Sequence, residues 1–434
     1  MGANPLRGRR RLASHATTTR RAIPALPQPG IAQAKHERGW YITGAIIIAA
    51  IILYGRPQVI SGLVILIVIG TLSLIALLRN VPHPPPLLLP WLFVLTATAS
   101  AFWSTDAVET LRRCAALAVP LFAAGQIALY VPFDRFLKIA DYTFRTAILS
   151  SILMGLFAPG IGLTQAEVLH GTLRGIFIHR NLLGYMIILG VVTLLARRWN
   201  RQHGPTATLG WLLIYLFALQ WAGSAGAIVL VLFTCCVYGF VRWLARNPQS
   251  DRGAIVVVAV LLLSVSSLIT HRLIPVILDL LGRDLTFSNR IYIWEGAWNA
   301  LQERYWLGYG WGTILREDNT AATQMRRAAG WEVTSTHNGY LATALQIGVI
   351  GLAISILFLC VLLKRTLCAA LRNPGPQAFW SLQVVLILIL GDFIETRAFT
   401  NIGWFLLCLI GYYSYGVTEK SPPAFMPARS ALQS

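Results

Sequence analysis

A histidine stands where a polar stretch meets a long apolar run, in Ser335-Thr336-His337-Asn338-Gly339-Tyr340-Leu341. An imidazole titrates near neutral pH and can remove a proton from a hydroxyl group, so His337 is a candidate catalytic base. Asn338 and Tyr340 are candidate substrate-binding residues beside it. The Ser, Thr and Asn side chains of this segment also suit a helix start, and a simple capping cluster explains the segment equally well.

Arginines mark a second segment, Arg174-Gly-Ile-Phe-Ile-His-Arg180-Asn181, which leads into an apolar run. A guanidinium group binds phosphate oxygens in pairs, and the N–H groups at a helix start add to an anion site. Arg174 is therefore a candidate for catalysis by charge stabilisation, and Arg180 and Asn181 are candidates for substrate binding. A pair of interfacial anchors would have the same sequence.

The third segment begins at Arg290, and Ile291, Trp294, Trp298 and Leu301 share one face of the helix that the spacing predicts. Such a face suits the headgroup level of a bilayer. A cation in the first turn opposes the helix dipole and calls for an anionic partner, which makes Arg290 a candidate catalytic residue. Trp294 is a candidate substrate contact. An amphipathic helix that merely rests on the bilayer would have the same sequence pattern.

An acidic segment, Gly391-Asp392-Phe-Ile-Glu395-Thr-Arg397, lies between two apolar runs near the C-terminus. An acid at the edge of a bilayer needs a partner. Asp392 could hold His337 or contact a sugar, and a salt link between the acids and Arg397 is an equally good interpretation.

Several common motifs are missing. The chain has only four lysines (Lys35, Lys138, Lys364 and Lys420), no Walker A sequence and no Asp-x-Asp pair. The cysteines have neither a disulfide pattern nor zinc spacing. Gly308-Tyr-Gly310-Trp-Gly312 reads as a flexible turn and lacks the spacing of a dinucleotide fingerprint. We therefore expect no cofactor and no metal.

Composition defines the class of protein that must position these residues. Hydrophobic residues make up 56% of the chain and charged residues 12%, which excludes an ordinary soluble protein. Continuous apolar runs predict an all-α polytopic membrane protein with about twelve transmembrane helices. The expected spans are 40–54, 57–78, 87–103, 114–131, 139–157, 182–196, 209–222, 227–244, 254–270, 338–363, 378–390 and 398–415.

The distribution of Lys and Arg predicts the orientation, because these residues stay on the cytoplasmic side. It places both termini in the cytoplasm and the long polar loop in the periplasm of a bacterial inner membrane, with short amphipathic helices in that loop. We expect five parts: a disordered basic cytoplasmic tail (1–38), helices 1–9 (39–270), the periplasmic loop with part of the active site (271–336), helices 10–12 (337–416) and a second cytoplasmic tail (417–434).

The net charge of +19 is a weak argument for nucleic acid. The Lys and Arg residues of the expected cytoplasmic segments account for most of the excess positive charge, and the basic tail suits anionic membrane lipids. We expect no nucleic-acid partner.

Three ordered signatures resemble the O-antigen ligase and polymerase superfamily of bacterial membrane glycosyltransferases. They are Arg174 to Gly184, Arg290-x3-Trp294 followed by the glycines of 308–312, and His337-Asn338-x-Tyr-Leu341 followed by Gln346-Ile-Gly348-Val-Ile-Gly351. One departure is Gly223-Ser224-Ala225-Gly226, where the family often has Ser-Arg-Gly. An arginine role at that position does not carry over.

The resemblance implies a GT-C-like fold and metal-independent, inverting transfer of a glycan from undecaprenyl pyrophosphate to a hydroxyl group. The donor would be undecaprenyl-pyrophosphate-linked O-antigen, and the acceptor would be lipid A–core. His337 would be the base or orient the acceptor. Arg174, Arg180 and Arg290 would bind the pyrophosphate, where preorganised cations stabilise the charge of the leaving group.

Two alternatives remain open at this point. An O-antigen polymerase shares the same motifs, although one long loop and a compact size favour the ligase. A twelve-helix transporter of lipid-linked glycans should show related halves and charges near mid-span, whereas the charges here fall almost entirely at span ends. A non-catalytic scaffold would leave His337 and the arginines unexplained.

Overall fold

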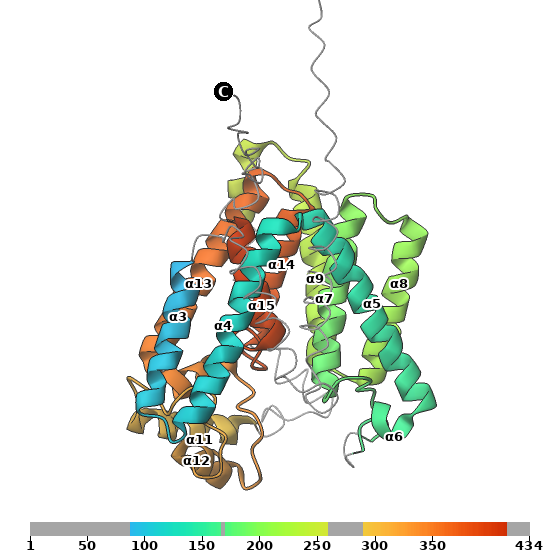
Figure 1. Cartoon of the computed structure of the whole chain (residues 1–434). Coiled ribbons are helices and arrows are strands. Elements are labelled where there is room, and N and C mark those ends of the chain that lie inside the picture. Colours follow the sequence, from blue (N-terminus) through green and yellow to red (C-terminus); the bar gives the residue numbers. More distant parts are fainter. Residues whose placement is uncertain (1–86, 166–169, 259–289, 415–434) are drawn as a thin grey trace, which may run out of the picture. The chain divides into compact units, whose positions relative to one another are not determined.

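The computed structural model describes residues 87–165, 170–258 and 290–414, and within these ranges the chain is all-helical (Figure 1). The predicted spans at 40–54 and 57–78, and most of the span at 254–270, lie outside the described residues. The helices are α3 (Leu88–Ala99), η1 (Ser100–Phe102), α4 (Ala107–Tyr130), α5 (Phe133–Phe157), α6 (Pro159–Gly162), α7 (Arg180–Trp199), α8 (Pro205–Ala222), α9 (Ala225–Leu244), α11 (Arg290–Glu303), α12 (Thr320–Ala329), α13 (Gly339–Arg372), α14 (Pro376–Gly391) and α15 (Asn401–Ser414).

Five of the described helices are long and apolar enough to cross a membrane: α4, α7, α8, α9 and α13. Helices α3, α14 and α15 are apolar but shorter. The expectation of an all-α protein with membrane-length helices is confirmed, and the count of twelve stays a prediction.

Helix α7 is enclosed by other described helices. It packs against α5, α8, α9 and α14, while α15 packs on α4 and α13 packs on α3 and α14. Almost every side chain of α7 from Leu183 to Arg197 is buried. The helix therefore fixes the position of its first residues, Arg180 and Asn181, relative to four neighbouring helices.

A charged cluster is buried between α5 and the last turn of α7. The Asp141 carboxylate accepts hydrogen bonds from Arg197, from Arg145 at 2.8–2.9 Å and from His203 at 3.1 Å. Asp141 is fully buried, and Arg145 also lies over the Trp211 ring at 4.5 Å. These opposite charges are tolerated in an apolar helix pair because they neutralise one another.

Helix α13 is interrupted at Ile347 and Gly348, where the backbone leaves helical geometry and Gly348 has a φ of 68°. The carbonyl groups of Leu345 and Gln346 are satisfied from outside the helix, by the N–H groups of Tyr309 (2.8 Å) and Gly310 (2.9 Å). A Cβ atom at Gly348 would collide with the backbone of the same loop at Trp306. The interpretation of the 308–312 glycines as a flexible turn is wrong: the loop is hydrogen-bonded to a broken helix, and only glycine permits this approach.

The predicted helix after residue 290 exists as α11, and of the four residues predicted to share one face, Leu301 is buried while Ile291 and Trp298 are exposed. Ile293, Ala297 and Ala300 are buried, whereas Ile291 and Trp298 are about half exposed. The small residues allow α12 to approach closely: a Cβ at Gly296 would lie 2.6–2.7 Å from the α12 backbone. Ile293 and Leu301 are buried in the same contact between α11 and α12, and the placement of the other face at the headgroup level stays a prediction.

Candidate active site

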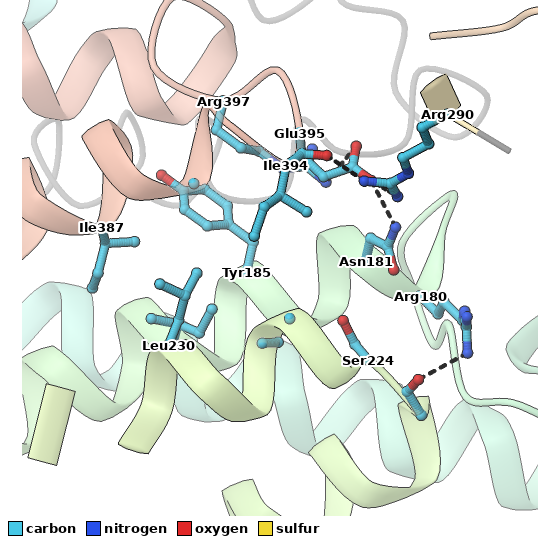
Figure 2. Close-up of a pocket in the computed structure, with 15 residues that line it drawn as sticks. Arg180, Asn181, Tyr185, Ser224, Leu230, Arg290, Ile387, Ile394, Glu395 and Arg397 are labelled. Atoms are coloured by element: carbon cyan, nitrogen blue, oxygen red, sulfur yellow. Dashed lines mark hydrogen bonds and ion pairs between the residues drawn. The ribbon is translucent and has the colours of Figure 1, made fainter. Parts of the chain in front are cut away.

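A cavity of about 220 Å³ lies at the start of α7, beside the α8–α9 turn and the α14–α15 turn (Figure 2). One part of its lining is polar and includes Arg180, Asn181, Arg290, Glu395 and Arg397. Another part is apolar and includes Ile188, Ala227, Leu230, Ile387 and Ile394. Three arginines against one glutamate leave these lining side chains with a net positive charge, which suits an anion attached to an apolar group.

Glu395 is the centre of the polar part. Its Oε1 atom accepts hydrogen bonds from Asn181 Nδ2 at 2.8 Å, from Arg290 Nη2 at 3.1 Å and from His337 Nδ1 at 3.1 Å. Figure 2 shows Asn181 and Arg290 converging on this carboxylate from α7 and α11. The Glu395 side chain is only 17% exposed, so the three donors replace the water that a carboxylate otherwise needs.

These donors determine the charge of Glu395. Burial acts to raise its pKa, but the hydrogen bond from His337 and the positive charges of Arg397 and Arg290 outweigh burial and lower the pKa to about 2. Glu395 is therefore ionised at neutral pH.

His337 is held by both its backbone and its ring. It is one of two described non-glycine residues with positive φ, at 49°, and its N–H donates to Ser335 Oγ at 3.1 Å. Because a carboxylate only accepts, Nδ1 carries the proton in the contact with Glu395. Nε2, which has no hydrogen-bond partner among the described residues, is left as the basic nitrogen. A strained backbone and an oriented imidazole are typical of functional sites.

The segment around His337 is fixed by neighbouring helices. Asn338 is the N-cap of α13, and its Oδ1 accepts from the Leu341 N–H at 3.0 Å. Trp294 Nε1 donates to the Thr336 carbonyl at 3.0 Å, which links α11 to the residue before His337. Asn338 thus has the capping geometry that the alternative interpretation expected, while the ring of the preceding residue, His337, contacts Glu395.

Asp392 does not hold His337. Its Oδ1 accepts from the N–H groups of Arg397 (2.6 Å) and Ala398 (2.8 Å), and its carbonyl accepts from the Gly339 N–H at 2.7 Å. Asp392 therefore closes the turn that carries Glu395 and ties that turn to the start of α13. Tyr340 donates to the Ile389 carbonyl at 2.9 Å, which adds a second link between α13 and α14.

The structure separates the two arginines of the 174–181 segment. Arg174 is not among the residues that line the cavity; its Nε donates to the Ile161 carbonyl at 3.0 Å. Arg180 lines the cavity and donates from Nη1 to the carbonyl groups of Gly223 (2.9 Å) and Ala222 (3.4 Å). Arg180 thereby satisfies the C-terminal end of α8, a position where a cation is favourable.

The cavity is also lined by Glu395, Arg397 and Tyr185, which were not among the sequence candidates. Glu395 and Arg397 stood in the acidic segment, but only as partners of a salt link, and their separation in the structure is 3.8 Å between Arg397 Nη2 and Glu395 Oε2. Nothing in the sequence marked Tyr185 as a site residue, because a tyrosine inside an apolar run is most simply interpreted as part of the hydrophobic core. Among the described residues, no group of three His, Cys, Asp or Glu side chains could hold a metal ion.

The described helices and this cavity define a class: an all-helical membrane protein with a positively charged, partly apolar cavity. Residues 210–356 match the family model described as O-antigen ligase, in line with the sequence signatures. The match includes Arg290 and His337, and Glu395 and Arg397 lie beyond it. The family indicates glycosyltransferase-like activity on lipid-linked glycans. A comparison with curated proteins found no match.

Proposed function

We propose that the protein is an O-antigen ligase, which transfers O-antigen from undecaprenyl pyrophosphate to a sugar hydroxyl group of lipid A–core. The observation that carries the proposal is the hydrogen bond from His337 to Glu395, a residue that lines the positively charged cavity, in a chain of which residues 210–356 match the O-antigen ligase model. The protein would lie in a bacterial inner membrane, with the cavity facing the periplasm, as the distribution of Lys and Arg predicts.

His337 would act as the base. Glu395 accepts a hydrogen bond from Nδ1–H, which keeps this proton on Nδ1 and leaves Nε2 to accept the proton of the acceptor hydroxyl group. The negative carboxylate then stabilises the imidazolium that forms. The acceptor oxygen then forms a bond to the anomeric carbon of the donor. The bond from that carbon to the phosphate oxygen breaks, and its electron pair leaves with undecaprenyl pyrophosphate. Attack opposite the leaving group gives inversion.

The arginines would stabilise the leaving group. Negative charge develops on the pyrophosphate oxygens as the bond breaks, and guanidinium groups already in position need little reorganisation. Arg290 uses two of its N–H groups on Ile394 and Glu395, and a guanidinium has five. It can therefore hold Glu395 and contact a phosphate at the same time.

The test is transfer by the purified full-length chain in detergent, with undecaprenyl-pyrophosphate O-antigen and rough lipopolysaccharide followed on a gel. A glycan ladder on lipid A–core supports the ligase. Longer glycan that remains on undecaprenyl pyrophosphate would instead support a polymerase, and no reaction with substrates that a known ligase accepts would reject transfer altogether.

The base is tested with His337→Ala, which should abolish transfer but leave donor binding intact. His170→Ala is a matched control, since His170 is exposed and makes no hydrogen bond to Glu395. Normal turnover by the His337 variant would remove this residue from the mechanism.

A further inference from the structure

The three arginines that line the cavity differ in what already occupies their hydrogen-bond donors. Arg290 donates at 2.6 Å to Ile394 and at 3.1 Å to Glu395. Arg180 donates at 2.9 Å to the carbonyl group of Gly223. The Arg397 guanidinium makes no hydrogen bond to any described residue, and its closest carboxylate oxygen is 3.8 Å away on Glu395. Arg397 thus retains its full capacity to donate.

The surroundings of Arg397 leave it in a defined position. Its backbone N–H is bonded to Asp392 at 2.6 Å, and its guanidinium carbon lies 5.7 Å from the centre of the Tyr185 ring. The side chain is 20% exposed. Glu395 forms an ion pair with this cation at 3.8 Å, beyond hydrogen-bonding distance. The N–H groups of a mostly buried guanidinium are therefore left without acceptors, which is costly, and a ligand that accepts from them would remove that cost.

Two other groups on the same cavity also lack partners among the described residues. The Tyr185 hydroxyl group is buried without a hydrogen bond. The Gly226 N–H lies in the first turn of α9, and the N-cap Ser224 makes no side-chain hydrogen bond to that turn. In Figure 2, Tyr185 lies between Arg397 and the α9 residue Leu230. Guanidinium, hydroxyl and helix N–H are all donors to an oxyanion.

The lining indicates which anion fits. Several donors from different elements suit a group with many acceptor oxygens, and a planar guanidinium binds two phosphate oxygens at once. The apolar side chains of Ile188, Leu230 and Ile387 continue from Tyr185 along the same cavity. A diphosphate attached to a hydrocarbon chain matches both parts, whereas an inorganic anion would leave the apolar part unused.

We propose that Arg397, supported by the Tyr185 hydroxyl and the Gly226 N–H, binds the diphosphate of a prenyl-linked donor, while Arg180 acts mainly as a positioning residue. This inference rests on the proposed function, because it names the part of the cavity that takes the donor. Arg290 remains at the boundary between the diphosphate and Glu395, and Arg174 has no direct contact with the donor.

The experiment measures binding, independent of turnover. The purified full-length chain in nanodiscs is titrated with farnesyl diphosphate, farnesyl monophosphate, farnesol and inorganic diphosphate by calorimetry. The wild type should bind farnesyl diphosphate more tightly than the other three. Arg397→Gln should weaken farnesyl diphosphate binding about 10- to 100-fold, the value of a lost charge-assisted hydrogen bond, and leave farnesol binding unchanged.

Two further variants support the comparison. Arg397→Lys keeps the charge but loses the paired donors, so its affinity should lie between those of the wild type and Arg397→Gln; it decides the matter if the Gln variant does not fold. Arg112→Gln is the matched control, since Arg112 is exposed on α4 and its partner Glu109 keeps Arg113. It should bind like the wild type.

The outcomes separate the inference from the proposed function. Wild-type affinity for farnesyl diphosphate in both Arg397 variants would overturn the role of Arg397 and leave the ligase proposal standing. Equal affinity of the wild type for farnesol and farnesyl diphosphate would overturn the prenyl-diphosphate donor, and with it both proposals.

Discussion

The Glu395→Gln substitution tests the centre of the proposed mechanism. It keeps the size of the side chain and an acceptor oxygen but removes the negative charge. In the wild type, this charge lies 3.1 Å from His337 Nδ1 and would stabilise the imidazolium that forms when the acceptor hydroxyl group loses its proton. The amide cannot do so, and we therefore expect kcat to fall while donor binding is retained.

The magnitude follows from the geometry. Two unit charges 3.1 Å apart interact by about 5 kcal/mol at an effective dielectric constant near 20. The two side chains are 17% and 28% exposed, so solvent screening lowers this figure toward the value of a charge-assisted hydrogen bond, about 1.5–3 kcal/mol. That range corresponds to a decrease in kcat of about 10- to 150-fold.

The assay is single-turnover transfer from lipid-linked donor to lipid A–core at saturating donor. Glu332→Gln is the control, because Glu332 is 67% exposed and pairs with Arg326 away from the cavity. Any residual transfer by His337→Ala, measured at high enzyme concentration, should not fall further when Glu395→Gln is added, since both residues act as one unit. A kcat for Glu395→Gln within twofold of wild type, or the same loss in both backgrounds, would refute the reasoning.

Four further outcomes are expected. Gly348→Ala should prevent folding, because the new Cβ meets the 306–307 backbone, whereas Gly239→Ala, with open space around it, should fold normally by size-exclusion chromatography. Asp141→Ala should lower the free energy of unfolding by about 3–5 kcal/mol, since it leaves two buried arginines without their carboxylate, and the folded fraction should keep wild-type turnover. Burial raises the pKa of Asp392 to about 6, against the backbone hydrogen bonds that lower it, so the folded state binds this proton more tightly. The free energy of unfolding should therefore fall by about 2 kcal/mol as the pH rises from 4 to 6; Asp392→Asn should remove this dependence in chemical unfolding at the two pH values. Transfer should persist in EDTA, and a loss that Mg²⁺ restores would contradict metal-independent chemistry.

Local properties of the chain could be predicted from the sequence. Continuous apolar runs predicted helices because a backbone in lipid must satisfy its own hydrogen bonds. The spacing after Arg290 predicted α11, and Asn338 has the capping geometry that its type and position favoured. His337 stood out because it directly precedes that cap. Each of these features depends on residues within a few positions of one another.

The partners of these residues were decided by tertiary structure. Glu395 meets His337 across 58 positions, Arg290 across 105 and Asn181 across 214. No local pattern encodes such distances, so the sequence left Glu395 as one half of a possible salt link with Arg397.

The same reason separates the arginines. Residue type and spacing identified Arg174 and Arg180, but packing placed Arg174 against the Ile161 carbonyl and Arg180 against the end of α8. Arg397 is left facing the cavity without a hydrogen bond to any described residue. The sequence by itself determined the kind of protein and identified His337 as a candidate. The packing of α7, α11 and the α14–α15 turn decided which charged groups surround that histidine, because only a folded chain brings them within hydrogen-bonding distance.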